Sequence, residues 1–271
     1  MTRVATLQMV STEIVEHNLE IASDLIHEAA ENQAELVVLP ENFSLMGRDE
    51  HDKLAILETF GKGPLQDFLA TQAKQHGIWL VGGTIPLQAN QADRIRASSL
   101  LYNPDGECIA RYDKMYLFDV IVDKEREEYY CESDTIEEGD EVVVARTPVG
   151  NIGLSVCYDI RFPELYRNMH SQAVQIITVP SAFTATTGEA HWEFLLRARA
   201  VENLCYVVAS NQGGKHVNER ETWGHSMIVD PWGKILAQAK QGPAVACANI
   251  DLKQQEALRN NFPALNHRKP D

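Results

Sequence analysis

The alternation of long apolar segments with amphipathic ones constrains the fold of this 271-residue chain more than any other feature. The segment "RVATLQMV" at 3–10 predicts a buried strand, and residues 17–31 carry apolar side chains at helical spacing. A second apolar segment, "ELVVLPE" at 35–41, follows directly. This order predicts a β-α-β unit at the start of the chain.

The same plan continues along the first half of the chain. The segment at 63–77 predicts a helix, because Pro64 suits a first helical turn and Gly77 suits a helix end. The next segment, "IWLVGGTIPL" at 78–87, is nearly continuously apolar and predicts one more strand. Strands of this composition are typical of a sheet that is buried on both faces.

From about residue 98 the pattern changes to hairpins, and the βα pattern returns between them. Residues 99–114 and 226–240 each predict two strands around a turn that contains proline and glycine. Between them lie predicted strands at 151–157, 174–181 and 204–211 and predicted helices at 162–172 and 189–203. Two α/β halves with hairpins predict a four-layer α-β-β-α sandwich, an α/β fold, in a single domain spanning 1–271. The periodicity is also compatible with a three-layer fold.

Charge and cysteine content exclude several classes of function. The net charge of −15 and the pI near 5.0 argue against binding to nucleic acid or to an anionic membrane through a basic surface. An anionic ligand would therefore need particular arginines. No segment reaches the roughly 18 apolar residues of a membrane helix. Five cysteines without a CxxC pair or a secretory signal predict a soluble, cytoplasmic protein without a disulfide framework.

Three reactive side chains follow predicted strands. Ligands of α/β proteins gather outside the carboxyl ends of strands, so these positions are candidate site residues. Glu41 could serve as a desolvated base or merely start a turn, and Lys114 could belong to a site or pair with Asp113 or Asp119. Cys157 precedes a predicted helix whose N-terminal dipole would stabilise a thiolate, whereas the alternative is a buried core cysteine.

Taken together, the three segments resemble the catalytic signatures of the nitrilase superfamily of carbon–nitrogen hydrolases. They are "LPENF" with Glu41, "YDKMYLFD" with Lys114 and "SVCYDIRFPEL" with Cys157, in that order along the chain. The resemblance extends over essentially all of the sequence. It implies one carbon–nitrogen hydrolase domain over 1–271, the α-β-β-α sandwich, and hydrolase chemistry on linear amides that needs no cofactor and no metal.

Within the superfamily, "CYDIRFPEL", the 181–203 segment and "GHSMIVDPWG" resemble the Nit branch. The segments "YYCESDTIEEGD" and "NQGGKHVNERETWGHS" are similar to those of the deaminated glutathione amidases in that branch. The resemblance implies hydrolysis of deaminated glutathione to 2-oxoglutarate and cysteinylglycine, a metabolite repair reaction. The alternative within the branch is an omega-amidase acting on 2-oxoglutaramate-type substrates.

The resemblance also implies residue roles. Glu41 is expected to act as the base and Cys157 as the nucleophile that forms a thioester. The Lys114 ammonium and the backbone N–H of Tyr158 are expected to hold the oxyanion. Glu132, seven residues before Gly139, matches the auxiliary glutamate of the superfamily, or else is a loop acid in an acidic segment. Tyr116 departs from the histidine more usual at its position.

The expected substrate carries carboxylates, so its binding residues are sought among the cations. Arg161 is the first candidate, although it could instead pair with Asp159 or Glu164. His191 is a second candidate that could equally cap or pack a helix start. Arg199 and Arg220 are weaker candidates.

Rival functions and the assembly state complete the predictions. A papain-like hydrolase would pair Cys157 with His225 or His191 and with an amide such as Asn211. A metal hydrolase is disfavoured because the nine histidines form no HExxH motif. A non-catalytic binding protein would have lost reactive residues that this chain retains. The superfamily resemblance implies a homodimer or a higher homo-oligomer.

Overall fold

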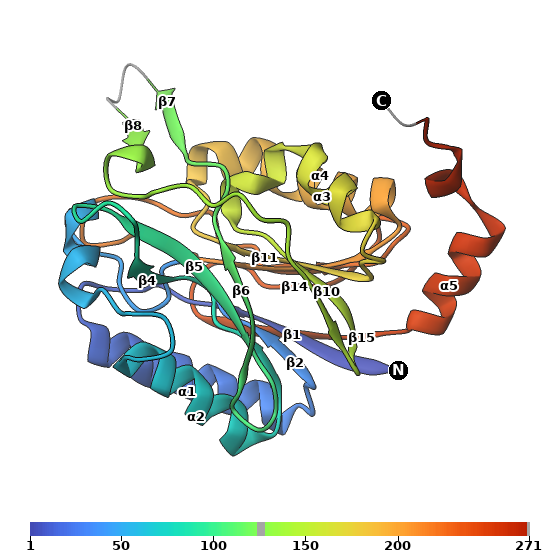
Figure 1. Ribbon diagram of the computed structural model, residues 1–271, viewed down its shortest axis with the longest axis horizontal. Coiled ribbons are helices and arrows are strands. Elements are labelled where there is room, and N and C mark those ends of the chain that lie inside the picture. Colours follow the sequence, from blue (N-terminus) through green and yellow to red (C-terminus); the bar gives the residue numbers. More distant parts are fainter. Residues whose placement is uncertain (124–127, 270–271) are drawn as a thin grey trace.

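Strands with apolar side chains on both faces determine the layering of the protein. The computed structural model describes residues 1–123 and 128–269. In the first strand, β1 (Thr2–Gln8), Val4 packs into the core between the sheets and Ala5 into a separate core under the outer helices. Figure 1 shows the result, two sheets lying face to face with a helical layer outside each. The predicted α-β-β-α sandwich is confirmed, and the three-layer alternative is wrong.

Within the described residues the strands form two large sheets and a separate hairpin. The first sheet has the order β15-β1-β2-β3-β5-β4, with β6 paired to β5, and the second has the order β14-β13-β12-β11-β10-β9. The remaining strands of the first sheet are β2 (Leu36–Val38), β3 (Trp79–Val81), β4 (Ile85–Gln88), β5 (Ile95–Tyr102), β6 (Cys108–Asp113) and β15 (Ala244–Ile250). Those of the second are β9 (Val144–Thr147), β10 (Gly150–Leu154), β11 (Ile176–Ser181), β12 (Tyr206–Asn211), β13 (Met227–Val229) and β14 (Ile235–Gln238), and the hairpin is β7 (Asp119–Asp123) with β8 (Glu128–Cys131).

The helices bury one face each against a sheet. Helices α1 (Val15–Glu31) and α2 (Pro64–His76) cover the first sheet, and α3 (Pro163–His170) and α4 (Ala185–Asn203) cover the second (Figure 1). Helix α5 (Leu252–Asn261) follows β15 near the C-terminus. The short 3₁₀ helices are η1 (Glu50–Ile56), η2 (Glu132–Asp134), η3 (Cys157–Arg161) and η4 (Ala264–His267). None of the helices in the described parts of the chain is long and apolar enough to span a bilayer.

The two sheets meet through strands β1 and β12. The Thr6 hydroxyl in β1 donates a hydrogen bond of 2.7 Å to the carbonyl of Ala209 in β12, and the Ser210 hydroxyl donates to the carbonyl of Leu7. These bonds satisfy buried polar groups and fix how β1 and β12 lie against each other. The carboxyl ends of strands from both halves of the chain therefore meet along one edge of the sandwich.

Several element boundaries differ from the prediction. The segment 78–87 forms two strands, β3 and β4, which pair one after the other with the same side of β5, while β6 pairs with its other side. The strand geometry is interrupted at Gly82 and Gly83, and Gly83 has a left-handed φ of 53°. Helix α4 begins at Ala185, four residues earlier than predicted, because the Thr184 hydroxyl accepts a hydrogen bond from the Thr187 amide and caps it.

Strand β15 was not predicted, and it ties the end of the chain to its start. It pairs antiparallel with the full length of β1, from Thr2 opposite Ile250 to Gln8 opposite Ala244. The pairing covers an edge of β1 that would otherwise be open. Strand β1 is thereby enclosed between β15 and β2.

The interruption at Gly83 gives a test of the fold. A Cβ at this residue would lie 2.1 Å from the carbonyl oxygen of Pro40, next to Glu41, whereas a Cβ at Gly77, with a similar φ of 64°, would meet nothing within 4 Å. We expect Gly77→Ala to cost about 1–2 kcal/mol from backbone strain. Gly83→Ala should cost a further 1–3 kcal/mol, roughly, from the clash. Urea unfolding of both variants measures the difference, and equal losses would contradict the close packing at Pro40.

Candidate active site

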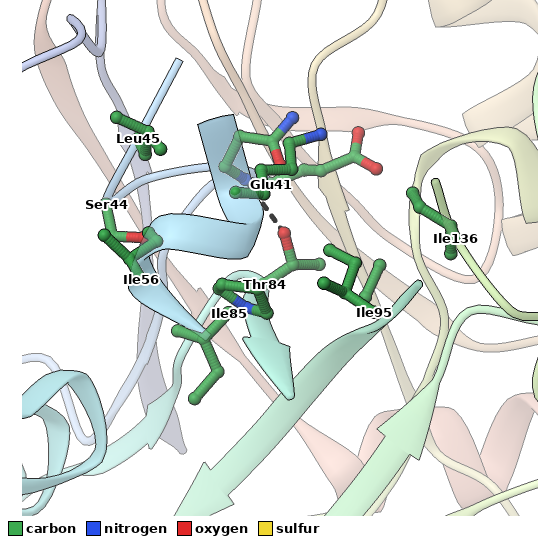
Figure 2. A pocket seen from close by; sticks show the side chains of 12 residues that line it. Glu41, Ser44, Leu45, Ile56, Thr84, Ile85, Ile95 and Ile136 are labelled. Carbon is green, nitrogen blue, oxygen red and sulfur yellow. Dashed lines mark hydrogen bonds between the residues drawn. The ribbon is translucent and has the colours of Figure 1, made fainter. Parts of the chain in front are cut away.

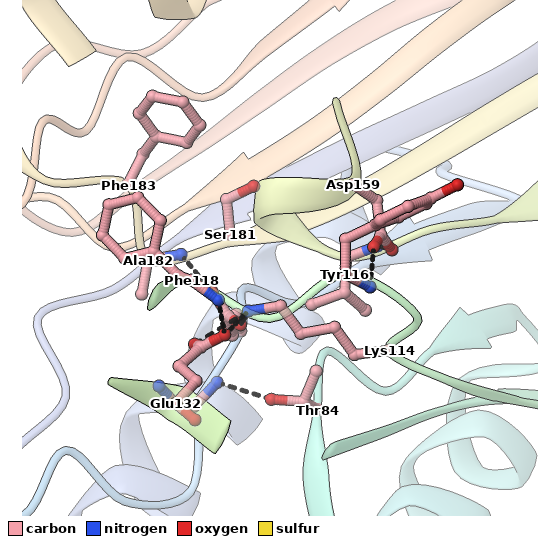
Figure 3. Close-up of polar contacts among 12 residues, drawn as sticks. Thr84, Lys114, Tyr116, Phe118, Glu132, Asp159, Ser181, Ala182 and Phe183 are labelled. Atoms are coloured by element: carbon pink, nitrogen blue, oxygen red, sulfur yellow. Dashed lines mark hydrogen bonds and ion pairs between the residues drawn. The ribbon is translucent and has the colours of Figure 1, made fainter. Parts of the chain in front are cut away.

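Four reactive side chains from different parts of the chain converge at the strand ends. Glu41 lies three residues beyond β2, Lys114 directly follows β6, Glu132 begins η2 and Cys157 begins η3 after β10. The exposed fractions of Glu41, Lys114 and Cys157 are 3%, 1% and 7%. The sequence predicted all four as site residues, and the structure places them together. Figure 3 shows Lys114 and Glu132 side by side.

Lys114 bridges the two glutamates. Its Nζ donates to Glu41 Oε1 at 2.9 Å and to Glu132 Oε1 at 2.8 Å (Figure 3). The second oxygens are held by backbone amides, because Ala182 N–H donates to Glu41 Oε2 and Phe118 N–H donates to Glu132 Oε2, both at 2.8 Å. Each carboxylate is thus fixed in position by one ammonium and one amide. Within the described residues, Lys114 forms no ion pair with Asp113 or Asp119, the alternative partners, and Asp113 pairs with Arg111 instead.

Burial and neighbouring charges set the protonation states. Burial disfavours the charge on Lys114, but the carboxylates of Glu132 and Glu41 outweigh it and hold the pKa of Lys114 well above its usual value. Burial would likewise raise the pKa of Glu41, yet the Lys114 ammonium and a hydrogen bond from Cys157 lower it on balance. Near neutral pH the site therefore holds an ammonium between two carboxylates.

The pKa of the Cys157 thiol and the helix that follows it differ from the prediction. Burial, reinforced by the Glu41 carboxylate, raises the pKa of the Cys157 thiol well above its ordinary value despite the nearby Lys114. The predicted stabilisation of a thiolate by a helix start is wrong, because Cys157 opens a five-residue 3₁₀ helix and α3 begins only at Pro163. The thiol is therefore protonated in the resting site and has an ionised carboxylate beside it.

The backbone at Cys157 has an uncommon conformation. Its φ is 46°, in the left-handed region that residues with a Cβ rarely adopt. The surrounding structure must hold this conformation, and the Asp159 carboxylate does so by accepting a 2.7 Å hydrogen bond from the Val156 amide. Tyr158, the expected oxyanion donor, lines the cavity beside Cys157.

A narrow cavity at Cys157 adjoins a wide outer one. The narrow cavity, with room for about one water molecule, is lined by Phe118, Glu132, Cys157, Tyr158, Ala182, Phe183, Thr184, Thr187 and Arg220. It shares Phe118, Glu132 and Arg220 with an outer cavity of about 780 Å³. The outer cavity has space for a substrate larger than a simple primary amide.

Glu41 also borders a small enclosed cavity away from Cys157. Figure 2 shows this space, walled by the aliphatic side chains of Ile56, Ile85, Ile95 and Ile136 and by the Thr84 hydroxyl. The Thr84 hydroxyl accepts a 2.9 Å hydrogen bond from the Asn42 amide and fixes the chain just after Glu41. The carboxylate of Glu41 thus lies in a region with little access to water.

Among the candidate cations, Arg220 lines both cavities. One of its Nη atoms donates to the carbonyl of Ala182, the residue whose amide binds Glu41, and its guanidinium lies 4.9 Å from the ring centre of Tyr130. Within the described residues its Nε is buried and has no hydrogen-bond partner. Arg220 therefore keeps donor capacity close to Cys157.

Arg161 and His191 lie behind the cavity wall. Arg161 Nη1 is 3.2 Å from His191 Nδ1, and its guanidinium stacks 5.2 Å from the ring of Phe183 and 5.7 Å from that of Tyr158. Neither residue lines the two cavities, as far as the structure describes them. Asp159 and Glu164 are not ion-pair partners of Arg161 in the described structure, since Asp159 binds Tyr112 and two backbone amides.

The remaining candidates have structural partners. Arg199 donates to the carbonyl of Ile160 and pairs with Glu202. The residues that a papain-like site would need are engaged elsewhere: His225 stacks on Trp223, and the Asn211 side chain bonds Phe183 and Gly224. Neither His225 nor Asn211 lines the cavity at Cys157. The papain-like arrangement therefore has no support in the described part of the chain.

Sequence reasoning missed the groups that hold the reactive side chains in place. The amides of Phe118 and Ala182 carry no residue-type signal, because any residue except proline supplies an N–H. Asp159 was considered only as a partner of Arg161. The signal available for Asp159 was its spacing, two residues after Cys157 in a segment whose neighbours are apolar or aromatic.

Comparison with known proteins agrees with this geometry. The carbon-nitrogen hydrolase family model matches residues 3–260. A protein of Yersinia enterocolitica named deaminated glutathione amidase is 41% identical over 98% of this chain and 92% of its own length. The human protein of the same name is 40% identical over 99% of this chain and 82% of its own length.

Solved structures give the same result for the fold. The Caenorhabditis elegans NitFhit protein superposes with a TM-score of 0.90 at 37% identity over 99% of this chain, which spans 65% of that fusion protein. Saccharomyces cerevisiae Nit3, a member of branch 10 of the nitrilase superfamily, superposes with a TM-score of 0.85 at 32% identity over 97% of this chain and 94% of its own. The chain therefore belongs to the carbon–nitrogen hydrolase family, within the nitrilase superfamily.

Proposed function

We propose that this hydrolase cleaves the amide bond of deaminated glutathione to give 2-oxoglutarate and cysteinylglycine, through a thioester on Cys157. The observation that carries the proposal is the buried ion pair of Lys114 with Glu41 and Glu132 beside a protonated thiol. Relatives about 40% identical over nearly the whole chain bear the name of this activity, which supports the substrate. We propose that residues 1–271 act as one catalytic domain.

In the first half of the reaction Glu41 accepts the thiol proton as the sulfur attacks the amide carbonyl. Transfer before attack is unfavourable, because the pKa of Cys157 is raised and that of Glu41 is lowered, so the two events must be coupled. The carbonyl oxygen becomes an oxyanion that the Lys114 ammonium and the Tyr158 amide stabilise. Glu41 then gives its proton to the leaving nitrogen, the C–N bond breaks, and cysteinylglycine departs.

In the second half Glu41 deprotonates a water molecule that attacks the thioester. The same donors stabilise the second oxyanion, the C–S bond breaks, and the thiol takes back its proton. One water molecule is consumed, and one acid and one amine are released. Glu132 keeps Lys114 charged while Glu41 gains and loses its proton, because Lys114 retains one carboxylate partner throughout.

The outer cavity is mostly acidic, so a negatively charged substrate needs an arginine there. The outer cavity is lined by six carboxylate side chains: Asp49, Glu50, Glu132, Asp134, Glu219 and Glu221. The cations on the same wall, apart from His51, are Arg48, which pairs with Glu13, and Arg220. We infer that Arg220 binds a substrate carboxylate and that Arg161 supports the wall. Self-association and a cytoplasmic location stay predictions from the sequence.

The direct test compares kcat/KM on deaminated glutathione with kcat/KM on 2-oxoglutaramate. We expect deaminated glutathione to be preferred at least about tenfold, which corresponds to about 1.4 kcal/mol of transition-state discrimination. Cys157→Ala should abolish turnover of both substrates while its thermal unfolding remains cooperative. A preference for 2-oxoglutaramate would identify an omega-amidase instead, and activity retained by Cys157→Ala would rule out the thioester mechanism.

Glu132 is tested against a glutamate of similar exposure in another ion pair. Glu132→Gln removes one of the two carboxylate charges that pair with the Lys114 ammonium. We expect kcat to fall about 10- to 100-fold, because the oxyanion would be stabilised less well. Glu202→Gln removes a charge that pairs with Arg167 and Arg199, away from both cavities, and should change kcat less than threefold, roughly. Steady-state kinetics on both variants decide, and equal effects would contradict the role of Glu132.

The charge role of Arg220 is tested by substrate pairs. Arg220→Met should lower kcat/KM for deaminated glutathione about 10- to 100-fold, because a hydrogen bond between charged groups contributes about 1.5–3 kcal/mol. For an analogue with both carboxylates blocked, the same variant should show a much smaller fall in kcat/KM. Arg161→Met is the matched control and should affect the two substrates equally. Equal losses on both substrates in Arg220→Met would show that Arg220 only shapes the wall.

A further inference from the structure

Asp159 connects the two chain segments that carry Lys114 and Cys157. Its Oδ2 accepts 2.6 Å from the Tyr112 hydroxyl and 2.7 Å from the Val156 amide, and its Oδ1 accepts 3.1 Å from the Tyr116 amide. Tyr112 and Tyr116 lie two residues before and two residues after Lys114. Val156 directly precedes Cys157. One carboxylate thus spans the oxyanion cation and the nucleophile.

The link is buried and closely packed. Asp159 and Tyr112 are fully buried, and the Tyr112 oxygen also accepts a 3.4 Å hydrogen bond from the Met115 amide, next to Lys114. The ring of Tyr116 stacks on Phe162 at 3.8 Å, which adds an apolar contact between the same two segments. Figure 3 shows Asp159 and Tyr116 beside Lys114. In this setting a lost acceptor cannot be replaced by solvent.

The conformation of Cys157 makes this link consequential. A non-glycine residue at φ 46° is strained and keeps that backbone only if its neighbours impose it. The bond from Val156 to Asp159 holds the residue immediately before the strained one. The bonds to Tyr112 and Tyr116 hold the Lys114 segment against the same carboxylate. Moving either segment changes the distance between the nucleophile and the cation.

We propose that Asp159 is a positioning residue that keeps Cys157 and Lys114 in register for oxyanion formation, and that its carboxylate must be ionised to do so. The inference rests on the proposed catalytic roles of Cys157 and Lys114. An ionised carboxylate accepts from all three donors. A protonated one must use an oxygen as a donor, yet two of its three partners are backbone amides that cannot accept, and the Tyr112 hydroxyl can accept only by giving up its own bond to Asp159. Protonation therefore weakens the link.

The titration of Asp159 falls in an accessible range. Burial, only partly offset by the bonds from Tyr112 and Val156, raises its pKa to about 6 from the usual 3.8. Tyr112, Lys114 and Tyr116 face Asp159 from β6 and the residues after it, and Cys157 lies two residues away in η3. From the helices, Tyr166 of α3 faces it, and Arg199 of α4 stacks on Tyr166 and donates to the carbonyl of Ile160, the residue after Asp159. Lys114 stays charged and Glu41 titrates below its usual value, so neither titrates near pH 6.

The sign of the linkage separates loss of activity from unfolding. Between 3.8 and about 6 the folded protein binds a proton at Asp159 that the unfolded chain does not. This group therefore makes the fold more stable, not less, as the pH falls through that window. A fall in kcat across the window would reflect the weakened link rather than unfolding driven by Asp159.

The test uses two buried tyrosines as a matched pair. Tyr112→Phe removes the hydroxyl that binds Asp159, and Tyr166→Phe removes an equally buried hydroxyl that donates to Ser155 instead. We expect Tyr112→Phe and Asp159→Asn to lower kcat about 10- to 100-fold, the scale of a misplaced catalytic group, with KM changed less than threefold. Tyr166→Phe should change kcat less than threefold, roughly.

The pH profile supplies a readout that a merely structural role would not change. Wild type and Tyr166→Phe should lose kcat below about pH 6, and Asp159→Asn should show low kcat without that limb. An unchanged limb in Asp159→Asn, or equal losses of kcat and melting temperature in both tyrosine variants, would overturn the inference. If Cys157→Ala stays active, the proposed function fails instead, which is a different outcome.

Discussion

The buried ammonium of Lys114 is the group on which the site depends. An unpaired charge at this depth would cost several kcal/mol, and the fold offsets that cost with two carboxylates that backbone amides also hold. The same arrangement keeps Glu41 ionised in a place where burial alone would neutralise it. Removing Lys114 would leave two carboxylates without their cation, whereas removing one glutamate would leave Lys114 with a single carboxylate partner. The ion pairs therefore stabilise the fold and also set the charges of the site.

The sandwich brings this cluster together by joining strand ends from distant segments. Glu41 and Lys114 follow strands of the first sheet, whereas Cys157, Asp159 and Ala182 follow strands of the second. The contacts between β1 and β12 bring the two sets of strand ends to the same edge. In the proposed mechanism the thiol attacks without a preformed thiolate. Its raised pKa keeps the sulfur protonated until a carbonyl carbon is close enough for coupled attack.

Sequence reasoning predicted the layers correctly and singled out residues that lie together in the structure, for clear physical reasons. Apolar periodicity identifies strands and helices, and a charged or thiol side chain after an apolar strand stands out, as at Glu41 and Cys157. The remaining features depend on three-dimensional contacts. The split at Gly83 follows from the proximity of Pro40, and the raised pKa of Cys157 follows from burial beside Glu41. The spacing of apolar residues reveals neither the proximity of Pro40 nor the burial of Cys157. It also gave no sign that Arg220 rather than Arg161 would line the cavity.

The central claim is that Cys157 carries the acyl group between the two halves of the reaction. The most direct measurement is mass spectrometry of peptides from enzyme quenched in acid during turnover of deaminated glutathione. The account predicts a 2-oxoglutaryl adduct on Cys157, with the exposed Cys108 and Cys131 unmodified. Turnover without an adduct on Cys157, combined with full activity after that thiol is alkylated, would contradict the account.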